Sequence, residues 1–276
     1  MLRITALMDN KLTANRELTA EHGLSLLLRY NGRRILFDCG ASGSFLHNAQ
    51  ALGENLCRLD AVILSHSHYD HAAGFRALAE AGLGGSILFT GPHFFEPKIS
   101  RSGDGFLDRS AGFDREFLRA KGVCHREVIL HDEIFPGVHL IGGFPSEHPL
   151  EQIPEKFCRI TPEGCRQDDF ADEICMALEV SGGLAVLVGC AHPGIVNMLR
   201  HVNTTLGMPV RAVFGGTHLA DADDARLRYT VDSLQHLGVE IIGFSHCSGE
   251  AAVTLASSLP GIRSPYLGCG DSFTID

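Results

Sequence analysis

Four side chains that can bind metal ions fall within six consecutive residues of this 276-residue chain. They are His66, His68, Asp70 and His71, in a run that follows the apolar stretch Leu59–Leu64. Neutral imidazoles and a carboxylate are good ligands for zinc, iron or manganese. So many ligands in one loop would be a poor arrangement without an ion. We therefore expect a site in which the i, i+2 histidines face one metal while Asp70 and His71 turn toward a second.

Other apolar runs also end in side chains suited to metal binding or acid–base chemistry. Leu184–Val188 precedes Cys190 and His192, Val210–Phe214 precedes His218, Val239–Phe244 precedes His246 and Cys247, and Arg33–Phe37 precedes Asp38. In α/β sheets, sites form at the carboxyl ends of strands, where loops converge. If these runs are strands that share a direction, their last residues should meet at one sheet edge and form one site.

The elements that must position these residues follow from apolar periodicity. Strands are predicted over Leu2–Met8, Leu24–Tyr30, Arg33–Phe37, Leu59–Leu64, Ser86–Thr90, Ile174–Val180, Leu184–Val188, Val210–Phe214 and Val239–Phe244. Helices are predicted over Phe45–Leu52, Ala72–Ala81, Ile195–Thr205, Ala222–Leu237 and Gly249–Ser258. Asn31-Gly32 and Ser181-Gly182-Gly183 are typical of hairpins. The mixture predicts an α/β protein with a mixed sheet, and the missing Gly-x-Gly-x-x-Gly argues against a dinucleotide fold.

Residues 91–171 show a less regular pattern. They hold most of the prolines, with apolar strands predicted only near Val123–Leu130 and Val138–Ile141. We interpret this stretch as an insertion or subdomain within a single domain that spans residues 1–276. It could shape the pocket or a contact in a homodimer. A glycine-containing loop there carries Asp104, Asp108 and Arg109. We interpret it as a plain surface loop, with a lid over the site as the less favoured alternative.

Composition limits the classes of partner. The formal net charge is −10 and no run of Lys and Arg stands out, so we expect no nucleic-acid partner, because phosphate contacts need clustered positive charge. No apolar segment reaches about 18 residues, so no membrane span is expected. The nine cysteines are scattered without a Cys-x-x-Cys pair. Reduced thiols in the cytoplasm are the simplest interpretation.

The motifs together resemble one protein family. His66-Ser67-His68-Tyr69-Asp70-His71 matches the His-x-His-x-Asp-His signature of the metallo-β-lactamase superfamily. The segments LMDN, AEHGLSLLL, ILFDCG, GCAHPGIVN, GGTHL and SHCSG are similar to a subgroup of metal-dependent hydrolases of β-lactamase superfamily II. That subgroup includes enzymes similar to the dihydropterin ribofuranosyl-aminobenzene phosphate synthase. The resemblance covers nearly the whole chain except residues 91–171.

This resemblance implies a four-layer αββα sandwich with two divalent metal ions at one edge. The ions would be zinc, with iron or manganese as alternatives. His66 and His68 would hold the first ion, and Asp70, His71 and His246 the second. Asp38 would support the site from behind the ligands.

The remaining ligands depart from the family pattern. Many members carry a bridging Asp after a later strand, where this chain has Cys190, with His192 two residues on. His192 is the preferred ligand, Cys190 as a thiolate is the alternative, and His148 could stand in for the usual third His.

Further residues are assigned roles at this edge. Asp70 would orient the nucleophile while it holds the second metal. His218 would contact substrate or donate a proton, with a supporting hydrogen bond as the alternative. His22 would reach the site from the first hairpin and contact substrate, with a hydrogen bond within its loop as the slightly favoured alternative. Asn197, near the start of a helix, would bind an anion or cap that helix.

The leading function is a metal-dependent hydrolase that activates water against a phosphoester or another small polar substrate. One alternative is a transferase that joins a dihydropterin-methyl diphosphate to an aryl phosphate on the same site. Another is a di-iron redox or sensor protein, although such members carry a flavodoxin domain that is absent here. A nucleic-acid hydrolase is disfavoured by the acidic balance.

Overall fold

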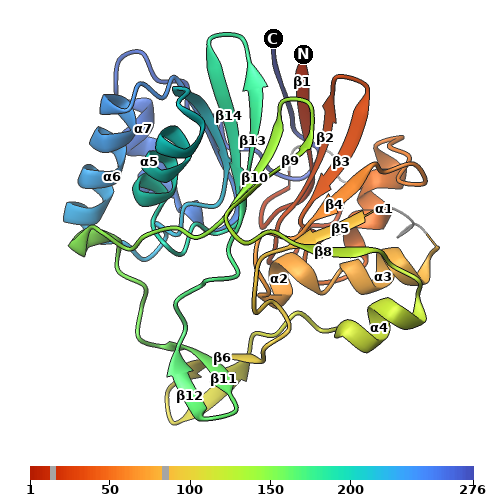
Figure 1. Cartoon of the computed structure of the whole chain (residues 1–276). Helices are drawn as coiled ribbons and strands as arrows, with labels where there is room; N and C mark the ends of the chain where they lie inside the picture. Colours follow the sequence, from red (N-terminus) through yellow and green to blue (C-terminus); the bar gives the residue numbers. More distant parts are fainter. Residues whose placement is uncertain (13–16, 83–86) are drawn as a thin grey trace.

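The computed structural model describes residues 1–12, 17–82 and 87–276 and contains two large β-sheets that face each other (Figure 1). The first sheet has the order β17 (Ser272–Ile275), β1 (Leu2–Met8), β2 (Ser25–Tyr30), β3 (Arg33–Phe37), β4 (Ala61–Ile63), β5 (Ile87–Thr90) and β8 (His125–Glu127). The second has the order β16 (Ile241–Phe244), β15 (Val210–Gly215), β14 (Gly183–Val188), β13 (Cys175–Val180), β10 (Val138–Ile141) and β9 (His131–Phe135).

Helices cover the outer face of each sheet (Figure 1). On the first sheet these are α1 (Ser44–Ala51), α2 (Tyr69–Ala72), α3 (Phe75–Glu80) and α4 (Arg115–Ala120). On the second they are α5 (Ile195–Leu206), α6 (Asp224–His236) and α7 (Glu250–Ser257). The four-layer αββα architecture is thereby confirmed. None of the described helices is long and apolar enough to cross a membrane.

Three apolar clusters hold these layers together. The largest lies between the sheets, where Ile4 and Leu28 of the first sheet share a cluster with Met176 and Leu187 of the second. The other two join each sheet to its helices. Full burial of one such side chain contributes about 1.5–3 kcal/mol, so the sheet positions are strongly fixed.

Strand direction brings the predicted site residues to one edge. β3, β4, β5 and β8 run parallel, and so do β14, β15 and β16. The carboxyl ends of each set therefore lie at the same edge, as expected from the sequence.

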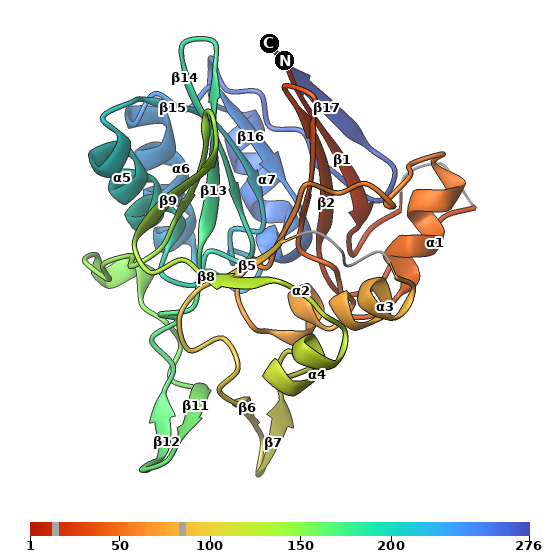
Figure 2. The same ribbon diagram turned by 45° about the vertical axis from the view of Figure 1, so that its right-hand side comes forward.

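A third, smaller sheet lies beyond this edge. It has the order β12 (Gly164–Gln167), β11 (Phe157–Thr161), β6 (Lys98–Ser102) and β7 (Gly105–Asp108), and we call it the wall sheet. Figure 2 shows its strands extending away from the two main sheets. Both ends of the segment 91–171 build the wall sheet, while the middle of the segment supplies α4, the edge strands β8 and β9, and β10, which pairs between β9 and β13.

Two predicted elements differ from those observed. The strand expected over Val123–Leu130 is reduced to β8, because the chain beyond it crosses to the second sheet and leaves Ile129 and Leu130 about two-thirds exposed. The helix expected over Ala72–Ala81 is split at Gly74, which packs so closely on the Cys39 carbonyl that a Cβ would lie 2.0 Å from its oxygen. Ser86, the expected start of a strand, lies outside the described residues, and β5 begins at Ile87.

Candidate metal centre

Among the described residues, ligand-type side chains form four groups at the carboxyl edge of the main sheets, and three of these groups share members. Within each group the ligand atoms lie within 4.8 Å of one another. The groups are His66–His68–His192, His66–His71–Cys190, Cys190–His218–Cys247 and His22–Asp70–His246. Members of all four groups line one cavity of about 360 Å³. We call the loops after β4, β14, β15 and β16 that carry most of these residues the site floor.

The first group consists of three buried histidines. His66, His68 and His192 are 0, 5 and 2% exposed. Burial, with smaller contributions from nearby positive charges, holds the pKa of each imidazole well below its usual value. The rings are therefore neutral. His66 Nε2 and both ring nitrogens of His192 have no hydrogen-bond partner, which fits an ion-binding role because unpaired buried polar atoms are rare.

Asp38 and Ser65 orient the histidines from behind. The Ser65 hydroxyl donates to Asp38 Oδ2 at 2.8 Å and lies 3.0 Å from His66 Nδ1. The same carboxylate oxygen lies 2.6 Å from His71 Nδ1. A hydrogen bond at Nδ1 fixes the ring and leaves Nε2 free to act as a ligand. Asp38 thus occupies the supporting position that the sequence predicts.

His192 is held by two neighbours that the sequence analysis missed. Its ring stacks on Phe170 with centroids 3.8 Å apart. The carboxylate of Glu173 accepts hydrogen bonds from the backbone N–H groups of Ala191 and His192, at 2.7 and 2.9 Å. Complete burial raises the pKa of Glu173 to about 8. These contacts fix the turn that presents His192.

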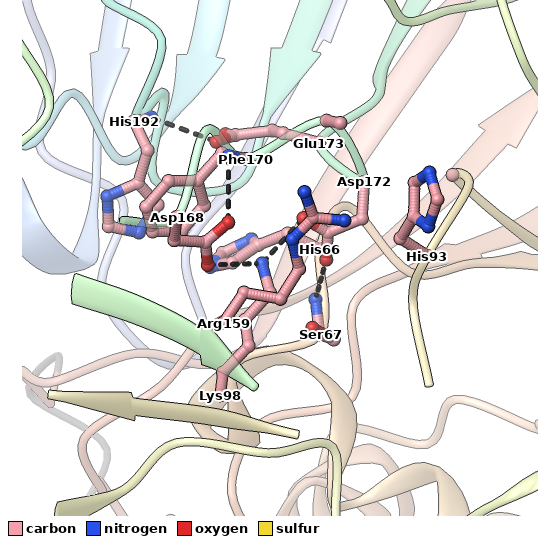
Figure 3. Close-up of polar contacts among 12 residues, drawn as sticks. His66, Ser67, His93, Lys98, Arg159, Asp168, Phe170, Asp172, Glu173 and His192 are labelled. Atoms are coloured by element: carbon pink, nitrogen blue, oxygen red, sulfur yellow. Dashed lines mark hydrogen bonds and ion pairs between the residues drawn. The ribbon is translucent and has the colours of Figure 1, made fainter. Parts of the chain in front are cut away.

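A buried charge cluster connects the wall sheet to the site floor (Figure 3). Lys98 of β6 is 1% exposed and its Nζ lies 2.6 Å from Asp172 Oδ1 and 2.9 Å from Asp168 Oδ2. Although burial opposes its charge, the two carboxylates raise the pKa of Lys98 above its usual value. The other oxygen of Asp172 accepts from Ser67 N–H at 2.8 Å. Lys98 therefore anchors the loop between His66 and His68. No sequence motif marked this cluster.

The carboxylate of Asp70 organises the second group. Its Oδ2 lies 3.0 Å from His22 Nε2 and 3.3 Å from His246 Nε2. Burial opposes ionisation, yet the hydrogen bonds from His22 and His246 hold the pKa of Asp70 well below its usual range. His246 Nδ1 in turn lies 2.8 Å from Asn10 Oδ1. His22, predicted as a substrate contact, is thus placed beside a predicted ligand, with its side chain 55% exposed.

His71 contacts both Cys190 and His246 on the site floor. Its Nε2 is 3.1 Å from Cys190 Sγ, and its ring centroid is 4.9 Å from that of His246. Burial would lower the pKa of His71, but Asp38 outweighs burial and raises it to about 9. The raised pKa keeps the imidazole of His71 protonated, and a metal ion bound at Nε2 would displace the proton from that nitrogen.

His218 is brought to the cavity beside the two thiols Cys190 and Cys247. Its Nδ1 is buried without a hydrogen-bond partner, whereas its backbone N–H donates to Cys247 Sγ at 3.2 Å. Its ring forms a ligand group with these two thiols and lines the cavity, where it can contact a bound molecule.

Two residues considered in the sequence analysis lie away from this cavity. Asn197 is 2% exposed and its Nδ2 donates to Pro193 O at 2.9 Å. The start of α5, where it was expected to bind an anion, is already occupied by the Glu151 carboxylate, which accepts from Val196 and Asn197 N–H at 2.9 and 2.8 Å. His148 caps the short helix η1 (Pro149–Glu151) and stacks on Tyr229 at 3.9 Å. Neither residue belongs to the ligand groups found among the described residues.

Backbone strain concentrates at the floor. Asp38, Ala191, His218 and His246 adopt left-handed conformations, with φ of 59°, 55°, 50° and 51°. Each non-glycine residue held in this way costs about 1–3 kcal/mol, and such residues cluster at functional sites. The packing of the two main sheets behind the floor must offset this conformational cost.

The wall sheet and its approaches add positive charge to the cavity. Arg101, Arg109 and Lys156 line it together with members of the ligand groups. Arg109 Nε donates to the Ser100 hydroxyl at 2.8 Å. Across the described ranges, none of these three cations forms an ion pair with a carboxylate. This unpaired charge stands out in a chain whose net charge is −10.

Comparisons with known proteins agree with this geometry. A family model described as the metallo-beta-lactamase superfamily matches residues 18–83. The chain is 31% identical to the 7,8-dihydropterin-6-methyl-4-(beta-D-ribofuranosyl)-aminobenzene-5'-phosphate synthase of Methanocaldococcus jannaschii, over 90% of this chain and 88% of that protein.

Solved structures give the same result. Tm1679, described as a metal-dependent hydrolase of the beta-lactamase superfamily, is 30% identical and superposes with a TM-score of 0.84, covering 100% of this chain and 99% of that one. YhfI from Bacillus subtilis, a metallo-beta-lactamase fold protein, has a TM-score of 0.60 at 13% identity over 99% of this chain and all of the other. The second likeness concerns the fold alone.

Proposed function

Since this chain belongs to the metallo-beta-lactamase superfamily, whose members include the synthase and the hydrolase compared above, we propose that it is a metal-dependent hydrolase acting on a small phosphoester. The observation that carries the proposal is the pair of neighbouring ligand groups, His66–His68–His192 and His22–Asp70–His246, on the floor of one cavity.

The donor set suits two divalent ions. His66, His68 and His192 would hold the first, and Asp70, His71 and His246 the second, with Cys190 between them. Two such ions, zinc or alternatively iron or manganese, would lower the pKa of a water molecule and polarise a phosphoryl oxygen. The unpaired nitrogens of His66 and His192 and the ionised Asp70 support this assignment.

The chain's own residues would then position the reactants. His22 Nε2 lies 3.0 Å from Asp70 Oδ2, so this contact would orient the Asp70 carboxylate, which can accept a hydrogen bond from the attacking water. His218 lines the cavity and its Nδ1 has no hydrogen-bond partner, so its ring would donate a proton to the leaving group. His22 would contact the substrate at the open side of Asp70.

The wall sheet favours a phosphoester over a neutral substrate. Arg101, Arg109 and Lys156 line the cavity without carboxylate partners. Guanidinium and ammonium groups bind phosphate oxygens well. We therefore propose that the segment 91–171 completes the active site by binding the anionic end of the substrate.

The experiment is a hydrolysis screen on protein reconstituted with zinc, iron or manganese. Phosphodiesters, phosphomonoesters and lactones are compared with Asp70→Ala as the inactive reference. We expect turnover of a phosphoester by the loaded protein and loss in the variant. Activity that survives in both His68→Ala and Asp70→Ala would refute the metal mechanism.

A second candidate is a transferase of the pterin type. It is favoured by the 31% identity to the M. jannaschii synthase over 90% of this chain. The test supplies a dihydropterin-methyl diphosphate with an aryl phosphate acceptor and measures diphosphate release. Release that depends on the acceptor would support the transferase, and release without it would support the hydrolase.

The cellular setting is also a proposal. All nine cysteines are free thiols, including the exposed Cys57, Cys124 and Cys165. This supports a reducing compartment such as the cytoplasm and a small-molecule substrate there.

A further inference from the structure

Two thiols meet on the site floor. Cys190 follows β14 and Cys247 lies in the 3-10 turn after β16, yet their Sγ atoms are 3.4 Å apart. Both residues line the cavity. The close approach depends on Gly216, where a Cβ would lie 2.6 Å from Cys247 Sγ.

The surroundings of Cys190 differ from those of the other buried cysteines. Cys39, Cys175 and Cys269 belong to the apolar clusters that join the sheets to their helices. Cys158 and Cys190 are also buried but belong to none of the apolar clusters found in the described chain, and of these two only Cys190 lies in a ligand group. A small apolar role therefore accounts for the first three cysteines and not for Cys190.

The neighbours of the thiol pair are metal-ligand types. Cys190 Sγ lies 3.1 Å from His71 Nε2 and belongs to two of the four ligand groups, one with His66 and His71 and one with His218 and Cys247. Cys247 Sγ accepts the backbone N–H of His218 at 3.2 Å. This backbone donor would support a thiolate at Cys247.

We propose that Cys190 and Cys247 bind a divalent ion of the centre as thiolates and so make the centre selective for thiophilic ions. The inference rests on the proposed metal centre and specifies which ions it accepts. Each S–H bond loses its proton to solvent as a metal–sulfur bond forms, and no electron is transferred. Thiolate ligands favour zinc, cobalt and cadmium over magnesium and manganese, which prefer oxygen.

The test uses cobalt(II) as a spectroscopic probe in the full-length protein. We expect a thiolate-to-cobalt charge-transfer band in the near ultraviolet from the wild type. Cys190→Ser and Cys247→Ser should each weaken the band, and the double variant should abolish it. Cys57→Ser, which changes an exposed cysteine, is the matched control and should leave the band unchanged.

Metal competition gives the second readout. The double variant should lose at least about tenfold in its preference for zinc over manganese. X-ray absorption of the wild-type zinc protein should show sulfur scattering, and this measurement does not depend on the folding of any variant.

The outcomes separate this inference from the proposed function. Cobalt bound without a charge-transfer band, or zinc with only nitrogen and oxygen neighbours, would overturn thiolate binding and leave the metal centre intact. A Cys190–Cys247 disulfide that persists in metal-loaded protein prepared under reducing conditions would also overturn thiolate binding. Failure to bind any ion would overturn the proposed function itself.

Discussion

The site floor and the wall sheet face the same cavity but are built in opposite ways. The floor consists of buried loops at the ends of packed strands, with His66, His71 and His192 almost fully covered. In the wall sheet every residue of β7 and β12 is exposed, and the buried Lys98 ties it to the floor. The comparison suggests that the floor supplies the chemistry and that the wall selects the substrate.

Substitutions in the site floor should reduce activity more than substitutions in the wall sheet. Asp70→Ala removes the carboxylate that His22 and His246 contact, so hydrolysis should fall about 10⁴-fold, equivalent to ~5 kcal/mol of transition-state stabilisation. Steady-state kinetics on metal-loaded protein measure the loss. His236→Ala, at the exposed end of α6, is the control and should retain full activity. Loss of less than about tenfold would remove Asp70 from the chemistry.

Loss of the contact between the wall sheet and the site floor should give the next largest effect. Lys98→Met leaves Asp168 and Asp172 buried without their cation, so the free energy of unfolding should fall by about 4 kcal/mol. Denaturant titration measures this. Lys121→Met changes an exposed lysine after α4 and should change stability by less than about 0.5 kcal/mol. Equal effects from both variants would mean that the wall sheet is not anchored through Lys98.

A crowded contact within the floor should give a smaller effect. A Cβ on Gly189 would lie 2.0 Å from the Ser65 hydroxyl that contacts Asp38 and His66. Gly189→Ala should therefore destabilise the protein by about 2 kcal/mol and weaken metal binding. Gly105→Ala, which meets only one atom at 3.8 Å, is the matched control. Thermal unfolding and metal titration of both variants decide the point, and an unchanged metal affinity in Gly189→Ala would count against the Ser65 link.

The wall itself should give the smallest effect, and a selective one. Arg109→Gln removes an unpaired cation from the cavity, so KM for a phosphoester should rise about tenfold, or ~1.4 kcal/mol, with kcat nearly unchanged. Hydrolysis of a neutral lactone should not change. Arg166→Gln, on the exposed strand β12, is the control. An equal rise in KM for both kinds of substrate would show that Arg109 does not recognise charge.

The same contrast explains what the sequence could predict. His66, His68, Asp70 and His71 form a dense local motif, and regular apolar strands placed His192, His218 and His246 at the same edge. The β-strands of the wall sheet were missed because β7 and β12 are exposed on both faces and carry no apolar alternation.

Contacts between residues that lie far apart in the chain could not be predicted from the sequence either. Glu173, Lys98 and Asp172 look like ordinary charged residues until the fold buries them. Asn197 looked like an anion ligand because the sequence cannot show that Glu151, 46 residues earlier, already occupies the start of α5. Such pairings form only when the chain folds, whereas local motifs already show the candidate ligands in the sequence.

The most direct test of the central claim is a metal count on this chain. Elemental analysis of protein reconstituted with zinc and freed of excess should give two ions per chain in the wild type and fewer in both His68→Ala and Asp70→Ala. Chelation should abolish phosphoester hydrolysis, and zinc should restore it. A wild type that binds no zinc, iron or manganese, or that hydrolyses its substrate unchanged after complete metal removal, would contradict a metal centre on the site floor.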